Sequence, residues 1–203
     1  MSWLSENFRT IAIAVLEVEL EPLEQATIDQ LQLWDVALAR ESLGARDIRL
    51  VCESEPMPSP LGGLRVMISP TDNGHAVLYC NLRDGYSALM YQLSRNLDCS
   101  IYRFFATLQV TEYPMNYMHI LSKGRTRRLV RTMRDERGWD FWQEGPPLYF
   151  ESQSIYAQRL KRLRLTANMV DEYVGYLGFG SLLALCSDSD SVALYLAQQP
   201  DQE

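Results

Sequence analysis

The sequence predicts an α+β fold, in which an antiparallel β-sheet is covered by helices. Segments rich in β-branched and aromatic residues follow one another through the middle of the chain, so the order of elements does not alternate as in a parallel α/β fold. Segments with helical spacing of apolar residues lie mainly in an N-terminal segment and at the C-terminal end. We expect the 203 residues to form one domain, residues 1–203, with a possible sub-boundary near residues 55–63.

The N-terminal segment fits two structures. Its apolar residues recur at helical spacing, which favours a helix over about residues 5–16, whereas partial alternation from Ile11 onward is typical of a strand. Pro22 is expected to end whichever element forms. A second helix is predicted from Thr27, a suitable N-cap, to Gly44.

The middle of the chain is predicted to be mostly strands. They are expected at residues 48–52, 64–69, 75–80, 101–110, 116–121, 125–133 and 139–142. Asn73-Gly74 and Lys123-Gly124 are the predicted turns, because both pairs tolerate positive φ. A helix from about Tyr86 to Leu97 separates the strands, since its apolar residues fall on one face.

The C-terminal part is predicted to be helical. Ser152 and Thr166 are candidate N-caps for helices that extend to about Leu165 and Leu177, and the glycines that follow predict a helix end. The apolar runs 182–186 and 192–196 then predict two short elements.

Charge is unevenly distributed along the chain. Residues 123–164 carry 11 of the 19 basic residues and 5 acidic ones, whereas residues 165–203 carry 6 acids and no base. Residues 1–60 have a net charge of −7, and the whole chain also has −7. Such asymmetry steers association with partners and does not set the fold.

The basic block allows three interpretations. It could bind nucleic acid, although the sequence pI of about 4.9 argues against that. It could pair internally with the acids of residues 1–60 and 165–203, or it could form a face for a protein partner. If residues 125–134 alternate strictly, neither face of that strand is wholly apolar. The candidate partner or anion contacts are Arg127, Arg128, Arg131, Trp142 and Arg162.

Other residues offer little chemistry. The four cysteines are widely spaced and predicted to be buried thiols, and the two histidines, His75 and His119, are expected to be structural. We therefore predict no catalytic residue, no metal site and no cofactor. No secretory signal is apparent, and the longest apolar run, residues 11–16, is far short of the ~20 residues that a membrane helix needs. We expect a cytoplasmic protein without membrane contact.

Aromatic residues are concentrated between Trp139 and Tyr156. Alternation would place Trp139 and Phe141 on one side of a strand and Asp140 and Trp142 on the other. One tryptophan would then be exposed or capped by a helix, and exposed tryptophans are typical of interfaces. A core cluster that seals the sheet is the alternative.

The second half of the chain resembles small bacterial proteins of the toxin-immunity type. The residues that carry the resemblance cover about a quarter of the chain: Gly124, Arg127, Asp135, Trp139, Phe141, Gly145, Pro147, Leu148, Phe150, Glu151, Tyr156, Arg159, Thr166, Tyr176, Leu177, and Gly180 or Gly178. The resemblance implies stoichiometric blockade of a cognate toxin and assigns no contact residue. The predicted function is non-enzymatic protein binding. The alternative is a regulator or enzyme that binds a phosphate-bearing ligand or nucleic acid through residues 123–164.

Overall fold

The structure is a computed structural model that describes residues 2–36, 38–43, 48, 51, 64–71, 73–82, 84, 86–186 and 192–197. Its strands are β1 (Thr10–Leu16), β2 (Leu38–Leu43), β3 (Arg65–Pro70), β4 (Ala76–Cys80), β5 (Ser100–Thr107), β6 (Met115–Ser122), β7 (Arg125–Asp135), β8 (Gly138–Glu144) and β9 (Val192–Ala197). Its helices are α1 (Ser2–Asn7), α2 (Leu20–Leu33), α3 (Ser87–Asn96), α4 (Gln153–Tyr156), α5 (Ala167–Tyr176), α6 (Leu182–Cys186) and the 3-10 helix η3 (Lys161–Leu163).

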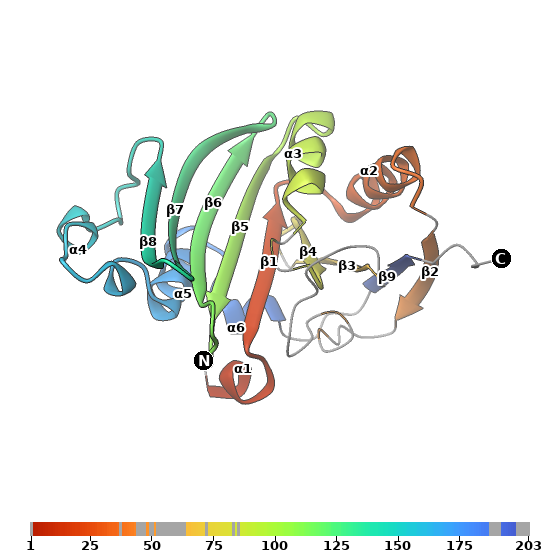
Figure 1. Ribbon diagram of the computed structural model, residues 1–203. Coiled ribbons are helices and arrows are strands. Elements are labelled where there is room, and N and C mark those ends of the chain that lie inside the picture. Colours follow the sequence, from red (N-terminus) through yellow and green to blue (C-terminus); the bar gives the residue numbers. More distant parts are fainter. Residues whose placement is uncertain are drawn as a thin grey trace.

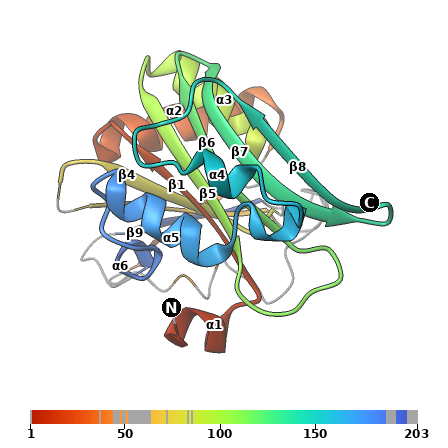
Figure 2. The same cartoon turned by 90° about the vertical axis from the view of Figure 1, so that its left-hand side faces the viewer.

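The strands form one nine-stranded sheet in the order β2-β9-β3-β4-β1-β5-β6-β7-β8, and every described pairing is antiparallel (Figure 1). Helices α2 and α3 lie on one face and α5 and α6 on the other (Figure 2). We call these the α3 face and the α5 face. The predicted α+β class is therefore confirmed. The predicted sub-boundary at residues 55–63 lies outside the described residues.

Strand β1 lies at the centre of the sheet and is buried along its whole length. Ile11, Ile13 and Val15 join the core on the α5 face, whereas Ala14 and Leu16 join the core on the α3 face. A strand buried on both faces has a nearly continuous apolar sequence, so its alternation is weak. The helix predicted over residues 5–16 is therefore wrong, and the competing strand forms instead, after the short helix α1.

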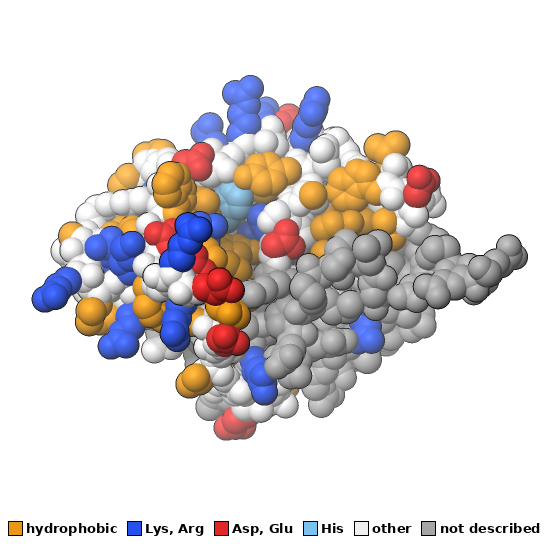
Figure 3. Space-filling model, viewed as in Figure 1, with side chains coloured by type: hydrophobic (Ala, Val, Ile, Leu, Met, Phe, Trp, Pro, Cys, Tyr) orange, Lys and Arg blue, Asp and Glu red, His pale blue; other side chains and the backbone are white. Residues whose placement is uncertain are grey.

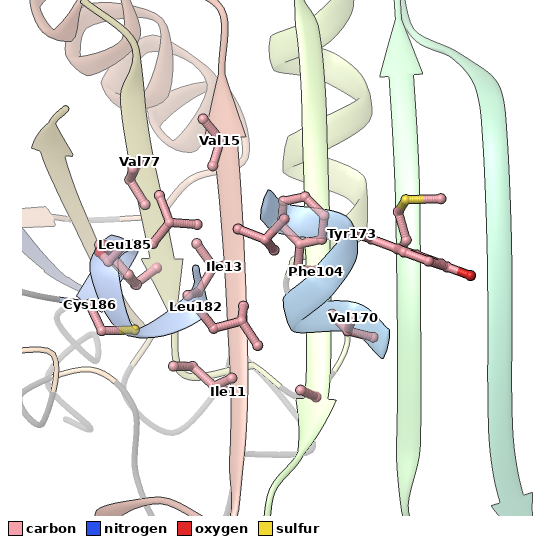
Figure 4. Packing of buried hydrophobic residues seen from close by; sticks show 14 of the residues in the cluster. Ile11, Ile13, Val15, Val77, Phe104, Val170, Tyr173, Leu182, Leu185 and Cys186 are labelled. Atoms are coloured by element: carbon pink, nitrogen blue, oxygen red, sulfur yellow. Dashed lines mark hydrogen bonds between the residues drawn. The ribbon is translucent and has the colours of Figure 1, made fainter. Parts of the chain in front are cut away.

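The α5 face holds the larger described core. Figure 4 shows Val170 and Tyr173 of α5 and Leu182 and Leu185 of α6 directed toward the sheet, where Phe104 lies. All five are nearly inaccessible to solvent. Burying side chains of this size stabilises the fold by roughly 1.5–3 kcal/mol each.

Helix α2 begins earlier than predicted. It starts at Leu20, so Pro22 lies in its first turn, and Thr27 is a buried interior residue, not a cap. The first N–H groups of a helix have no partner within it, and proline therefore costs little there. The helix ends at Leu33, followed by the positive φ of Asp35, which breaks helical geometry. Its predicted extension to Gly44 is therefore wrong, because residues 38–43 form strand β2; Gly44 itself lies outside the described residues.

The predicted hairpins form. Thr71 and His75 close the β3–β4 turn through a 2.8 Å backbone hydrogen bond, with Gly74 at φ +75°. Lys123 and Gly124 both have positive φ between β6 and β7, as a two-residue turn of the favoured type requires. Of the strand predicted over residues 48–52, only residues 48 and 51 are described, and a 3.0 Å backbone hydrogen bond joins them in a turn, so the prediction fails there.

The helix predicted over residues 152–165 is replaced by α4, η3 and irregular chain. Tyr156 and Leu165 both enter the core. Nine residues apart, they would point to opposite sides of a continuous helix, so the chain must leave helical geometry to bury both. Thr166 caps α5 as predicted, its hydroxyl accepting from Met169 N–H at 3.4 Å. The two short C-terminal elements are α6 and β9, and β9 inserts between β2 and β3.

The start of α2 gives a test of this fold. We expect Pro22→Ala to change the free energy of unfolding by less than about 1 kcal/mol, because Pro22 breaks no helical hydrogen bond. Asp29→Pro, at an exposed position inside the same helix, should cost about 3 kcal/mol. Chemical denaturation followed by circular dichroism measures both. A loss of less than about 1 kcal/mol from Asp29→Pro would contradict a helix that continues through residue 29.

Candidate functional site

A β-bulge lies near the start of β7. Ile120 pairs with Arg128, but the next residue, Leu121, pairs with Thr126, so Arg127 is the extra residue. A bulge of this kind changes which face the side chains on either side of it occupy. Sequence alone gave no sign of it.

The bulge overturns the predicted faces of β7. Thr126 and Arg128 were expected on one face, but Thr126 contacts His119 on the α3 face and Arg128 contacts Glu151 on the α5 face. Beyond the bulge the alternation is regular, and the buried residues are Arg128, Val130 and Thr132. The α5 side of β7 is therefore a core surface.

Arg128 is buried, with 1 % of its surface exposed, and forms an ion pair with Glu151. Its Nε donates to both carboxylate oxygens of Glu151, at 2.8 and 3.1 Å, and its Nη2 donates to the same carboxylate. Nη1 donates to the backbone oxygens of Gly145 and Glu144, at 2.8 and 3.2 Å, and Nη2 also reaches Gln143 Oε1 at 3.1 Å. A guanidinium so fully occupied is not available to a partner, so Arg128 must be removed from the candidate contacts.

The ion pair also shapes the loop after β8. Gly145 has φ +78°, and a Cβ there would lie 2.0 Å from the Arg127 carbonyl oxygen. Only glycine permits this approach, which brings the Gly145 carbonyl to Arg128. On the far side of the loop, Leu148 N–H donates to Glu151 Oε1 at 2.9 Å.

A second polar cluster lies beneath α3. Arg103, 3 % exposed, donates from Nη1 to His119 Nδ1 at 3.1 Å. Its Nη2 donates to the Asp84 carbonyl at 2.6 Å, to Ser87 Oγ at 2.8 Å and to Tyr117 Oη at 3.3 Å. These bonds fasten the start of α3 to β5 and β6.

The protonation of His119 follows from its partners. Arginine can only donate, so Nδ1 must accept and Nε2 carries the hydrogen, which it donates to Thr126 Oγ1 at 3.0 Å. Burial, with the charge of Arg103 as a second cause, lowers the pKa of His119 to about 3. His119 is thus a neutral structural residue, as predicted, and Tyr91 Oη extends the chain from Thr126 at 3.0 Å.

The recess beside Arg103 is too narrow to hold a water molecule. Its walls are Ala12, Ile13, Ala14, Leu78, Cys80, Arg103 and Tyr117. Burial raises the pKa of the Cys80 thiol to about 12, so this sulfur is protonated at neutral pH and a poor nucleophile. This cluster therefore holds the fold together and offers no ligand pocket in the described structure.

The remaining candidates include two cross-strand neighbours. Arg131 and Trp142 are opposite one another on β7 and β8, on the α3 face. Trp142 is 53 % exposed, and Arg131 is half-buried. Within the described part of the chain, Arg131 Nε is buried without a hydrogen-bond partner and Arg131 forms no ion pair. Figure 3 shows hydrophobic and basic side chains together over the β8 end of this face.

Arg127 and Arg162 are also exposed, but they do not complete a pocket with Arg131. Arg162 lies on η3, which packs on the α5 side of the hairpin, where Arg164 stacks at 5.2 Å over Phe141. The pocket of converging arginines expected for a phosphate-bearing ligand is therefore not formed. Phe141 joins the core and Trp142 does not, so the predicted division of these aromatic residues is correct.

Internal pairing of the basic block differs from the prediction. Its ion pairs among the described residues link Arg128 to Glu151 and Lys161 to Asp140, so the acids lie inside the block itself. Lys123 pairs with Asp98, outside it. Arg103 was not singled out from the sequence, and Glu151 was named only among the residues of the family resemblance, without a role. Arg103 carried one usable signal, a charge in the middle of an apolar strand.

Comparisons with protein-family models, with curated proteins and with solved structures give no match. Over the described ranges, none of the helices is long and apolar enough to cross a membrane. Within the same ranges, no cluster of three or more histidine, cysteine or acidic residues is placed to hold a metal ion. Cys80, Cys99 and Cys186 are buried, as predicted, and Cys52 lies outside the described residues.

The close approach at Gly145 predicts a large mutational effect. Gly145→Ala should lower the free energy of unfolding by about 3 kcal/mol or more, because it adds a backbone clash to the cost of positive φ. Gly74→Ala is the matched control: Gly74 has φ +75° but open space around it, and should lose about 1 kcal/mol. Urea denaturation measures both, and equal losses would show that the loop does not depend on this contact.

The buried imidazole predicts a pH dependence of stability. The unfolded chain protonates His119 near pH 6.5, whereas the folded chain does so only near pH 3, so stability is lost as the pH falls from about 6.5 toward 3. Asparagine at this position cannot titrate. Relative to His119→Asn, we expect the wild type to lose about 2 kcal/mol between pH 7 and pH 5. Parallel unfolding curves for the two proteins across this range would contradict the assignment.

Proposed function

We propose that this chain is a non-enzymatic protein that binds another protein, and that the partner is a cognate bacterial toxin domain which it neutralises in the cytoplasm. The observation that carries the proposal is the exposed Trp142 beside the unpaired Arg131 on the α3 face of the β7–β8 hairpin. The toxin itself is suggested by the resemblance of residues 124–180 to immunity-type proteins.

Tryptophan and arginine are the residue types that most often dominate binding energy at interfaces. The pair is carried by two strands that the Arg128–Glu151 ion pair holds against the core, so binding need not order a loop. Half-buried Leu129 and Met133 flank Arg131 on the same strand and face, and they extend the apolar surface around it. An apolar surface around a desolvated anchor is typical of a protein interface.

The proposal is tested with the product of the neighbouring gene. Co-expression should give a complex that stays together on size-exclusion chromatography, and deletion of the present gene should arrest growth unless its neighbour is also deleted. Absence of both effects would refute it.

Substitutions then locate the contact face. We expect Trp142→Ala and Arg131→Glu each to weaken the complex about tenfold or more, since each removes an anchor of the interface. Trp3→Ala is the matched control, because Trp3 is 41 % exposed but lies on α1, far from β8 in Figure 1. Titration calorimetry measures all three. If the two β7–β8 variants bind as tightly as wild type, the contact face lies elsewhere.

A further inference from the structure

Strand β8 is the last strand of the sheet, and its outer backbone edge is unpaired among the described residues. The direction of its backbone groups follows from β7. Arg134 N–H donates to the Pro114 carbonyl oxygen at 2.9 Å, on the β6 side, so the adjacent Asp135 and Met133 direct their backbone groups to β8.

The pairing then alternates along β8. Gly138, Asp140, Trp142 and Glu144 pair with residues of β7 whose backbone groups face β8, so these four use their own N–H and C=O groups in that ladder. The residues between them direct their N–H and C=O groups outward. They are Trp139, Phe141 and Gln143, and no backbone hydrogen bond of the described chain ends on any of them.

This edge lacks three of the usual protections of an edge strand, namely lysine, proline and a bulge, and its charged residues are Asp140 and Glu144. Natural edge strands carry lysine, proline or a bulge that discourages the pairing of another strand. Residues 138–144 contain neither lysine nor proline and pair with β7 without a register shift, and Pro146 and Pro147 come only after the strand ends. Figure 2 views the molecule from the β8 side; in this view α4 and α5 do not overlap β8, although α4 lies farther out than β8 in Figure 1.

We propose that the outer edge of β8 receives an extended segment of the protein partner as an additional antiparallel or parallel strand. Main-chain hydrogen bonds to Trp139, Phe141 and Gln143 would hold the segment, which is a common mode of peptide recognition. The inference rests on the proposed function, because it adds a backbone contact next to the Trp142 anchor.

The side chains of β8 specify the chemistry of that segment. Every second residue of β8 lies on the α3 face, and these residues include Asp140, Trp142 and Glu144. Glu144 forms no ion pair among the described residues. Asp140 reaches Lys161 only at 3.6 Å, and both side chains are about half exposed. A residue directly opposite on an added strand lies about 5 Å away, Cβ to Cβ. The segment that fits therefore has basic residues on either side of an apolar residue opposite Trp142.

The test uses the full chain and a synthetic peptide, Thr-Lys-Thr-Val-Thr-Lys-Thr, blocked at both ends, with the same peptide carrying glutamate for lysine as its control. Amide hydrogen exchange is followed by NMR. In the free protein, the amides of Trp139, Phe141 and Gln143 should exchange fast and those of Asp140 and Trp142 slowly. Millimolar lysine peptide should slow the three outward amides about fivefold or more, and the glutamate peptide should have less effect.

A matched pair of variants separates the contribution of the Gln143 backbone N–H from that of its side chain. Gln143→Pro and Gln143→Ala both remove the amide that contacts Arg128, but only proline removes the outward N–H. Peptide protection of Trp139 and Phe141 should persist in the alanine variant and disappear in the proline variant, with both shown to be folded by circular dichroism.

Two results would overturn the inference. If the outward amides gain no protection at millimolar peptide, no strand adds at this edge; the proposed function would still stand, because it is judged by the co-expression and gene-deletion experiments. If these amides are already protected in the free protein and lose protection on dilution, the occupant is a second copy of this chain.

Discussion

The ion pair between Arg128 and Glu151 organises the half of the sheet that carries the candidate site. Removing two charges from water is costly, and the cost is met only where every donor and acceptor is satisfied. Here the guanidinium joins β7, the end of β8 and the loop that leads to α4. The loop can reach it only because Gly145 passes close to the backbone of Arg127. One buried charge thus fixes the path of the chain from β8 to the helices of the α5 face.

The class of fold could be predicted from the sequence because it depends on the order of helices and strands. That order follows from the local spacing of apolar and turn residues and does not depend on how the strands are paired. The hairpin turns at Gly74 and Gly124, the cap at Thr166 and the amphipathic α3 all follow from local chemistry. The errors fall where tertiary burial overrides local pattern. Strand β1 is apolar on both faces and so mimics a helix, and the segment 152–165 leaves helical geometry to bury Tyr156 and Leu165 together.

The candidate site was only partly predictable, for a related reason. The sequence does not distinguish the roles of Arg127, Arg128 and Arg131. The bulge makes Arg127 the extra residue, places Arg128 in the core and leaves Arg131 on the α3 face. A bulge changes faces without leaving a clear composition signal. The buried arginine also needs an acid 23 residues away, in a loop whose position depends on the completed sheet. Trp142 was predictable because simple alternation holds along β8.

These constraints explain how the charges of the basic block are divided between the core and the surface. Its most deeply buried charge is used to build the hairpin, and Arg131, which forms no ion pair among the described residues, lies on the opposite face from that ion pair. The same division leaves Trp142 exposed while its neighbour Phe141 packs against Tyr156. A strand pair held from one side and open on the other is rigid before any partner arrives, so recognition there costs little conformational entropy. The charge asymmetry of the sequence therefore serves the fold first, and the proposed recognition would use the side chains that the fold leaves exposed.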